Sequence, residues 1–386
     1  MFLLIPGRAS VAAMFLTNGL IMGAWAPQIP LLLPRHGIGE SVLGLLILGL
    51  GLGAIATMHV AGRLCSTWGA DRTLRLFAAL SLPMLPLVIL APDLWLLAPA
   101  MVAFGAAVGC MDVAMNACAV AVERASGRAI MSSSHGFWSL GGFVGGSMGG
   151  LLITAAGPLG QALLVAATGA LLAGLAARRL PADPPQPADS PAPRHGMLPR
   201  DPAIWAVGGL ALLCILPEGA IMDWGALYLL KQLGSDTATS GLGFAAFSAC
   251  MAVMRFSGDA LRNRFGAVRT LRLSTLIAAL ALAGAALAPN APLAISAFAL
   301  AGLGLANTVP ILFSAGGNHP GLSPGAGLST VTMIGYSGIL VAPSAIGLVA
   351  EQAGYRLTYA ALAALLLIVS AAAPMARAAD GAQSRP

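Results

Sequence analysis

The chain has 386 residues, of which 58% are hydrophobic and only 9% are charged. A soluble domain typically carries about 25% charged residues, so this composition excludes a soluble globular protein and predicts an integral membrane protein. The net charge of +6 comes from short basic clusters between long apolar runs. Such clusters are typical of membrane topology signals and do not indicate nucleic-acid binding.

Twelve apolar segments are long enough to cross a bilayer, which takes roughly 20 residues. The first has no basic region ahead of it and no small-residue cleavage site, so we expect a membrane helix and not a removable signal. The sequence therefore predicts an all-α integral membrane fold with spans at approximately 9–33, 41–61, 73–92, 94–121, 129–155, 158–178, 203–230, 239–257, 269–288, 292–315, 325–350 and 355–376.

Between the sixth and seventh spans the sequence RRLPADPPQPADSPAPRHGMLPRDP holds eight prolines and several charges. Such a composition is typical of a solvated linker. We expect a six-helix bundle at 1–178, a linker at 179–202, a second six-helix bundle at 203–376 and a tail at 377–386. If the N-terminus lies inside, the inner segments hold 17 of the 20 basic residues. The sequence thus predicts cytoplasmic termini and a cytoplasmic linker.

The two halves repeat each other. NGLIMG at 18–23 aligns with EGAIMD at 218–223, which makes Asn18 the counterpart of Glu218. In the basic loops, Gly62 and Gly69 correspond to Gly258 and Gly266. Repeats of six spans in one orientation are typical of transporters built from two bundles, with the solute site between them.

These loops and segments resemble the major facilitator superfamily, whose loop motif is roughly G-x-L-x-D-R-x-G-R. GRLCSTWGAD has Ser66 where the motif has Asp, and the second copy is GDALRNRFGA. The corresponding residues are Gly62, Arg63, Gly69, Asp71, Arg72, Gly258, Asp259, Arg262 and Gly266. Four segments resemble the bacterial, fucose-permease-like branch and imply a location in the bacterial inner membrane: NGLIMGAWAPQIP, GCMDVAMNACAVAVE, MSSSHGFWSLGG and EGAIMDWGALYL. The resemblance implies that spans 1, 4, 7 and 10 line a central cavity.

Three acids fall inside predicted spans, where each ionisable group costs about 2.5–3.5 kcal/mol and is by default a functional candidate. They are Asp112, Glu218 and Asp223, and we expect them to couple transport to protons. Each has a structural alternative, namely a bond to a neighbouring helix or, for Asp223, a position at the outer interface.

Polar side chains on the same spans are candidate solute ligands: Asn18 and Gln28 on span 1, Asn116 on span 4 and Asn307 on span 10. His135 and Trp138 on span 5 are candidates too, although His135 can equally bond a backbone carbonyl. Trp25 and Trp224 can stack on a sugar ring or anchor the helices at the lipid interface. The glycines at 141, 145 and 149, and at 142, 146 and 150, are spaced for tight helix contacts.

The spans contain no lysine, and arginines cluster near their inner ends. Because an anion would need a buried cation, the sequence predicts a neutral solute, a sugar or polyol before an amine. No nucleotide motif, metal site or cofactor motif is present, so we expect a monomeric, proton-coupled transporter and no enzyme. An exporter of drugs or metabolites, or a protein that has lost transport, remains an alternative.

Overall fold

The computed structural model describes residues 7–126, 130–182, 201–320, 322 and 324–382, and they are almost entirely helical. The N-terminal half comprises α1 (Arg8–Trp25), η2 (Ala26–Gln28), α2 (Ile29–His36), α3 (Glu40–Trp68), α4 (Ala70–Ser81), α5 (Met84–Leu90), α6 (Leu94–Ser126) and α7 (Met131–Ala177). The C-terminal half comprises α8 (Pro202–Leu227), η3 (Tyr228–Gln232), α9 (Thr237–Phe265), α10 (Ala267–Leu287), α11 (Ala291–Leu305), α12 (Thr308–Gly317), α13 (Pro324–Ala372) and η4 (Ala373–Ala382).

In the described part of the chain, ten helical segments are long and apolar enough to cross a membrane. Two of these helical segments, in α7 and in α13, belong to helices that each contain two spans. Gly157 in α7 and Gly354 in α13 have φ angles of 75° and 81°, which interrupt the helix. Ile130 and Ala176 then pack in one apolar cluster, so the chain reverses at Gly157. Dividing α7 and α13 at these glycines gives the twelve spans that the sequence predicts.

The internal repeat is visible in the backbone. Helices α3 and α9 both have 29 residues. Glycines with positive φ recur 197 residues apart, in the pairs Gly37 and Gly234, Gly69 and Gly266, and Gly157 and Gly354. Glycine adopts this conformation without the steric cost that a Cβ imposes, so equivalent turns retain it.

The repeat does not pair Asn18 with Glu218. The residues capping the start of α1 and α8 are Gly7 and Asp201, which are 194 apart, and the glycines that follow α2 and η3 are 197 apart. The offset of 200 inferred from the NGLIMG and EGAIMD segments lies outside this range. The short sequence match between two apolar helices was misleading, and Asn18 and Glu218 are not equivalent.

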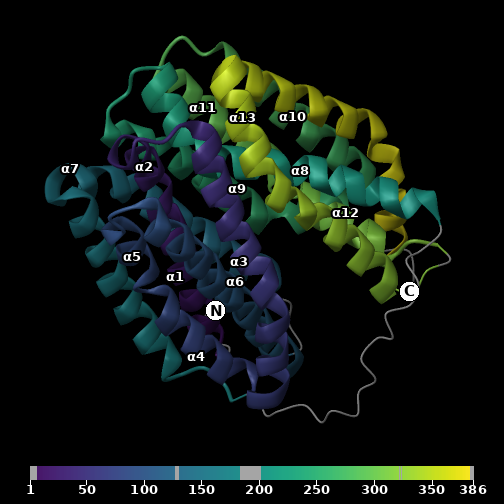
Figure 1. Cartoon of the computed structure of the whole chain (residues 1–386). Coiled ribbons are helices and arrows are strands. Elements are labelled where there is room, and N and C mark those ends of the chain that lie inside the picture. Colours follow the sequence, from purple (N-terminus) through teal and green to yellow (C-terminus); the bar gives the residue numbers. More distant parts are fainter. Residues whose placement is uncertain (1–6, 127–129, 183–200, 321, 323, 383–386) are drawn as a thin grey trace.

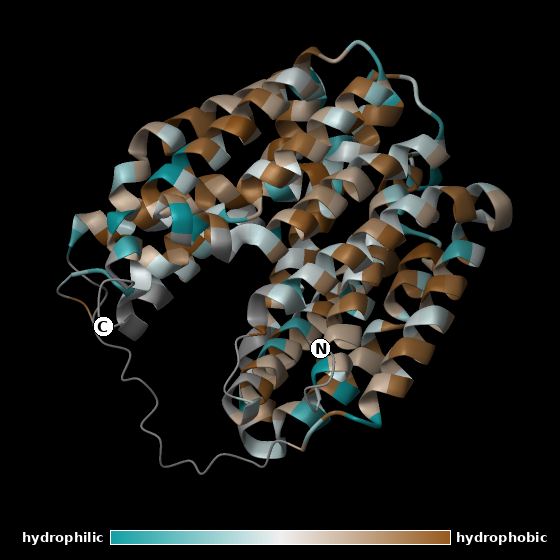
Figure 2. Cartoon of the chain, turned by 180° about the vertical axis from the view of Figure 1, so that it is seen from behind, coloured by the Kyte–Doolittle hydropathy of each residue, from teal (hydrophilic) through white to brown (hydrophobic). Residues whose placement is uncertain are grey.

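The two halves come together at one end of the molecule and diverge towards the other (Figure 1). We call the first the joined end, where Glu40 and Glu351 lie, and the second the splayed end, where Gly69 and Gly266 lie. Hydrophobic residues run along the helices of both halves, and hydrophilic residues gather towards helix ends and loops (Figure 2). This distribution suits helices that face lipid along their length.

Helix α7 carries two rows of glycines, and each row packs against a different neighbouring helix. A Cβ on Gly145 would lie 2.4 Å from the carbonyl oxygen of Leu20 in α1, within the same half. A Cβ on Gly150 would lie 2.5 Å from the carbonyl oxygen of Thr237 in α9, across the two halves. The predicted role of these glycines in tight helix contacts is therefore confirmed. One row serves a contact within a half, and the other serves a contact between halves.

Candidate functional site

Glu218 lies on α8, directly after the helix-internal Pro217. Its side chain is 26% exposed although it belongs to a membrane-spanning segment. Its Oε1 lies 3.6 Å from Nη2 of Arg255 on the neighbouring helix α9. Glu218 therefore faces a cation and has access to solvent.

Arg255 connects the two halves of the molecule. Its Nη1 donates a hydrogen bond of 2.9 Å to Oγ of Ser139, a buried residue of α7, while Nη2 approaches Glu218. Arg255 precedes the end of α9 at Phe265 by ten residues, or about 15 Å along the axis. Arg255 lies three residues before the end of the candidate span at Gly258, as expected of an arginine near a span end, and its long side chain finds partners inside the span.

The N-terminal half contributes a hydrogen-bonded pair next to Ser139. Nε1 of Trp138 donates to Oδ1 of Asn18 at 2.8 Å, and Nδ2 of Asn18 donates to the carbonyl oxygen of Val108 in α6 at 3.3 Å. Asn18 is only 2% exposed, whereas Trp138 is half-buried. The pair thus fixes the indole of Trp138 against α1 and α6.

Helix α6 places Asp112 and Asn116 one and two turns beyond Val108, on the same face. Both side chains are half-buried. The amide of Asn116 donates to the backbone carbonyl of Asp112 at 2.9 Å. The predicted common face is confirmed, and α6 adds a carboxylate and an amide to this region.

His135 lies one turn before Ser139 on α7 and is half-buried. Its ring meets the ring of Phe15 on α1 edge-on, with centroids 5.2 Å apart. It lies close enough to Arg255 to interact with its charge. We define the central cluster as the polar residues Asn18, His135, Trp138, Ser139, Glu218 and Arg255, with Asp112 and Asn116 beside it on α6.

The two candidate tryptophans lie outside this cluster. Trp25 and Trp224 are at most 1% exposed. Trp25 packs edge-on against Phe104, and Trp224 packs beside Tyr355. In this conformation they neither stack on a solute nor anchor at the lipid interface, because packing between helices covers both rings.

Gln28 holds a bend in the fold. Its Nε2 donates to the carbonyl oxygen of Pro158 at 2.9 Å and to Oε1 of Gln161 at 2.6 Å. Nε2 of Gln161 in turn donates to the carbonyl oxygen of Ala24. The Gln28 amide is thereby committed to the turn that follows Gly157.

The other two predicted polar residues are also apart from the central cluster. Asp223 is 6% exposed and lies within electrostatic reach of Tyr359, so the predicted alternative of a solvated outer position is wrong. Asn307 sits where span 10 breaks between α11 and α12, and its side chain packs against Gly258.

The loop-motif residues lie at the splayed end. Asp71 forms an ion pair of 3.2 Å with Arg75 at the start of α4. Arg262 donates from Nη2 to Oγ of Ser314 and to the carbonyl oxygen of Ala379 in η4. Residues 377–382, expected in a tail, thus belong to a short packed helix. The side chains of Ser66 and Asp259 lie outside the described residues.

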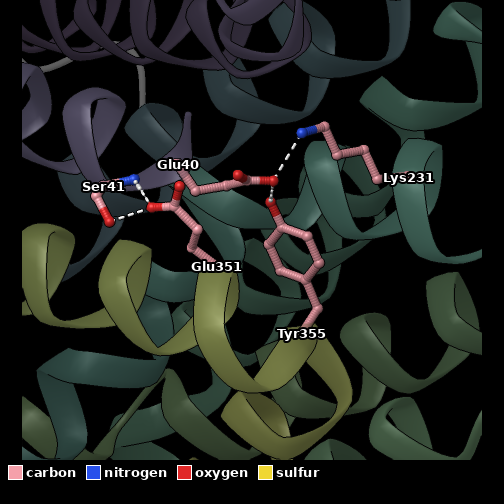
Figure 3. A network of polar contacts seen from close by, with 5 residues as sticks. All are labelled: Glu40, Ser41, Lys231, Glu351 and Tyr355. Carbon is pink, nitrogen blue, oxygen red and sulfur yellow. Dashed lines mark hydrogen bonds and ion pairs between the residues drawn. The ribbon is translucent and has the colours of Figure 1, made fainter. Parts of the chain in front are cut away.

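A second polar network joins the halves at the joined end, and the sequence-based candidates do not include it (Figure 3). Nζ of Lys231 lies 2.7 Å from Oε1 of Glu40, which also accepts a hydrogen bond of 3.4 Å from the Tyr355 hydroxyl. The backbone N–H and the hydroxyl of Ser41 both donate to Glu351. We call these five residues the rim network. The sequence held one indication of this network, because Lys231 is the only lysine among the 386 residues.

Comparisons with known proteins agree on one family. The Major Facilitator Superfamily profile matches residues 11–324. An uncharacterized MFS-type transporter of Yersinia pestis is 36% identical over 370 residues, which are 96% of this chain and 95% of the relative. The membrane protein MosC of Rhizobium meliloti is 32% identical over 375 residues, which are 95% of this chain and 90% of the relative.

Solved structures agree in fold. The structure of the nucleoside transporter NupG superposes with a TM-score of 0.73 at 14% identity. The match covers 96% of this chain and 98% of the NupG chain. A D-xylose–proton symporter has a TM-score of 0.71 at 13% identity, with coverage of 95% and 96%. These relatives do not single out the fucose-permease-like branch. They do show that the chain belongs to the Major Facilitator Superfamily, a family of membrane transporters and not of enzymes.

Proposed function

We propose that this chain is a proton-coupled secondary transporter that moves a small hydroxylated solute, of the size of a sugar or polyol, by alternating access. The observation that carries the proposal is the bridge from Ser139 through Arg255 to Glu218, because it joins the two halves and remains partly exposed within the spans. Buried charges in membrane spans are costly, so a charge pair kept there is a functional candidate.

Glu218 is the proposed proton-exchanging group. In its charged form it attracts Arg255 and holds α8 to the arginine that bonds α7. When Glu218 takes up a proton, this attraction within the C-terminal half ends, and Arg255 keeps its bond to Ser139 of the other half without the carboxylate charge of Glu218 beside it. Asp112 is the second candidate for this role because it is half-buried beside the central cluster. Asp223 is a weaker one because it lies apart from the bridge.

The hydroxylated solute is supported by the neutral polar groups of the cluster. The half-buried indole of Trp138 and, beside it on α6, the half-buried amide of Asn116 are the kinds of groups that bind hydroxyl groups, whereas the buried Asn18 and Ser139 hold Trp138 and Arg255 in place. The expectation of a neutral solute depended on the absence of a cation, and Arg255 removes that reason. The hydroxyl groups of the solute are therefore the part of the expectation that these residues support.

We further propose two rigid bundles, 1–178 and 203–376, that rock about the central cluster, with a linker at 179–202 and with η4 (Ala373–Ala382) packed on the second bundle. The splayed end would face the cytoplasm of a bacterial cell, with the chain in the inner membrane. The excess of arginine in the segments next to Gly69 and Gly266 supports this orientation.

The test is transport by the purified protein in liposomes that contain a pH-sensitive dye. A panel of sugars, polyols, amines and sugar acids is added outside, and both internal pH and electrical current are recorded. We expect at least one solute to drive protons inwards, and Glu218→Gln to reduce this movement at least ~100-fold, because glutamine cannot carry a proton.

The matched control is Asp93→Asn, which removes a carboxylate at an N-terminal helix cap while keeping a side chain that can cap. This variant is expected to transport normally. Proton movement that persists in Glu218→Gln would contradict the assigned role of Glu218. Folded wild-type protein that moves no proton with any solute would contradict proton coupling altogether.

A further inference from the structure

We propose that the groove between α10 and α11 binds the acyl chain of a phospholipid, and that Arg356 binds the phosphate of the same lipid. The lipid that fits has one net negative charge, as phosphatidylglycerol has. This site lies on the outside of the C-terminal half and goes beyond the proposed function, because it involves neither the solute nor the central cluster.

The first observation is the groove itself, a hollow of about 500 Å³ between α10 and α11. Ala281 and Ala297, which line it, are at most 8% exposed, and a Cβ on Gly284 would come no closer than 4.0 Å to Ala297. Four leucines that line the groove are more than half exposed: Leu280, Leu287, Leu293 and Leu300. Apolar side chains beside a hollow lose dispersion contacts, so an apolar chain that fills the hollow is favoured.

The second observation is the length and the place of the groove. Its α10 side extends from Ile277 to Leu287, or about 15 Å along the helix axis. The hydrocarbon core of a bilayer is about 30 Å thick, so one leaflet accounts for about 15 Å. The groove ends at the turn between the two helices, where Ala288 and Pro289 line it. Its length therefore matches an acyl chain of a single leaflet, with the headgroup at this turn.

The third observation is a cation at the headgroup end of the groove. Arg356 of α13 is exposed, and its Nη2 donates a hydrogen bond of 3.0 Å to the carbonyl oxygen of Ala288. This bond holds the guanidinium at the turn and uses one of its five N–H groups. Guanidinium groups bind phosphates through parallel N–H···O bonds, and basic pockets between membrane helices bind lipid headgroups. A phospholipid in the groove therefore has its phosphate at the depth of Arg356.

The charge of the site favours a lipid with a single negative charge. Among the residues that the structure describes, no carboxylate forms an ion pair with Arg356. A zwitterionic lipid also carries an ammonium group, which would need an acid beside the phosphate. Phosphatidylglycerol has a neutral glycerol there, so one guanidinium balances its charge.

A second copy of the chain fits the groove less well than a lipid does. Two copies have the same orientation in the membrane, so a twofold contact at the groove would place two Arg356 guanidinium groups at the same depth. Like charges at this place repel each other, whereas the phosphate of a lipid attracts the guanidinium.

The experiment is native mass spectrometry of the full-length protein in a neutral detergent. Phosphatidylglycerol, phosphatidylcholine and diacylglycerol, all with the same palmitoyl and oleoyl chains, are added one at a time. The fraction of protein with one lipid bound is measured against lipid concentration. A phosphatidylglycerol with a diazirine in its acyl chain then labels the residues that contact it.

We expect phosphatidylglycerol to bind about fivefold more tightly than diacylglycerol, which is the effect of one arginine on an anionic headgroup. Phosphatidylcholine should lie in between, because it has the phosphate but also an ammonium group. The photolabel should fall on α10 and α11 between Ile277 and Leu300.

Gly284→Leu should weaken phosphatidylglycerol binding at least ~10-fold, because the new side chain occupies the space of the acyl chain. Arg356→Gln should weaken it about fivefold and leave diacylglycerol binding unchanged. Gly174→Leu on α7 is the matched control, because Gly174 is also exposed and a Cβ there meets nothing within 4 Å. If Gly284→Leu does not fold, Ser296→Phe fills the groove from the exposed side of α11.

Equal binding of phosphatidylglycerol to all variants, or binding no tighter than that of the other two lipids, would overturn the inference. A photolabel outside α10 and α11 would do the same. Dimers that are lost in Gly284→Leu and do not respond to phosphatidylglycerol would assign the groove to a second copy and overturn the lipid site. No solute or proton gradient is used, so these outcomes are separate from those that test the proposed function.

Discussion

Two polar bridges connect the halves of this transporter, and they differ in depth. In the rim network, Lys231 lies 2.7 Å from Glu40, and Ser41 bonds Glu351 from both its backbone and its hydroxyl. In the central cluster, the contact that crosses the halves is the 2.9 Å hydrogen bond from Arg255 to Ser139, whereas the 3.6 Å contact of Arg255 with Glu218 lies within the C-terminal half. The rim pair is at the molecular surface, with Lys231 42% exposed, whereas Arg255 is 17% exposed.

The difference points to two separate tasks. The groups of the rim network bond each other at short distances, so the network needs no solute to hold the joined end together. The central link depends on Arg255, and this arginine also contacts Glu218, a carboxylate whose charge a proton can remove. We infer that the rim network stabilises one of two conformations, while the central cluster decides when the conformation changes.

The largest effect should come from preventing the halves from meeting at the joined end. Gly150→Leu places a side chain where a Cβ alone would lie 2.5 Å from the Thr237 carbonyl oxygen. Because this contact crosses the halves, the joined end cannot form, and uptake should fall at least ~10-fold. Gly174→Leu is the control, because a Cβ there meets nothing within 4 Å. Normal uptake by Gly150→Leu would mean that the α7–α9 contact is dispensable.

A smaller effect is expected from the rim network. Lys231→Met keeps much of the side-chain length but removes the ion pair with Glu40, and exposed pairs of this kind contribute about 0.2–1 kcal/mol. The ratio of opened to joined molecules should rise by up to about fivefold, while affinity for the solute in the joined state stays unchanged. Spin labels at Arg35 and Gln352, in a background without the five natural cysteines, report the opening by pulsed EPR. If Lys231→Met abolished proton-coupled transport as completely as Glu218→Gln, the two bridges would not have separate tasks.

The smallest effect should come from Ser41→Ala. The variant removes the hydroxyl bond to Glu351, and the backbone N–H of residue 41 still donates to the same carboxylate. A single neutral donor contributes about 0.5–1.5 kcal/mol, or more to a charged acceptor, and here the remaining bond limits the loss. The label distances should therefore shift by less than in Lys231→Met. A larger shift would show that Ser41, and not Lys231, holds the rim.

Much of the architecture could be predicted from the sequence, because twelve apolar runs leave few alternatives to a helical membrane fold. The loop glycines were also informative, since Gly69 and Gly266 adopt positive φ at the equivalent helix boundaries. The alignment of Asn18 with Glu218 was wrong, because short apolar helices resemble each other at several offsets. Positive-φ glycines, which have a structural cause, mark the repeat better than sequence similarity does.

The site could be predicted only in part. Glu218, Asn18, Trp138 and His135 were recognisable as polar residues within apolar spans. Arg255 was counted as an inner-end arginine, because one-dimensional spacing does not show that its side chain reaches Ser139 and Glu218. The rim network was missed for a related reason, since its members come from α3, η3 and α13 and meet only after folding.

The most direct test of the account is to measure both ends of the molecule in one set of samples. Pulsed EPR would record the distance from Arg35 to Gln352 at the joined end and from Thr67 to Arg264 at the splayed end, in the same cysteine-free background. On acidification with solute, the account predicts opposite changes in the two distances, and Glu218→Gln should show the low-pH distribution at about pH 7.5. Distances that stay constant, or that lengthen together, would contradict the claim that Glu218 controls an exchange between two conformations.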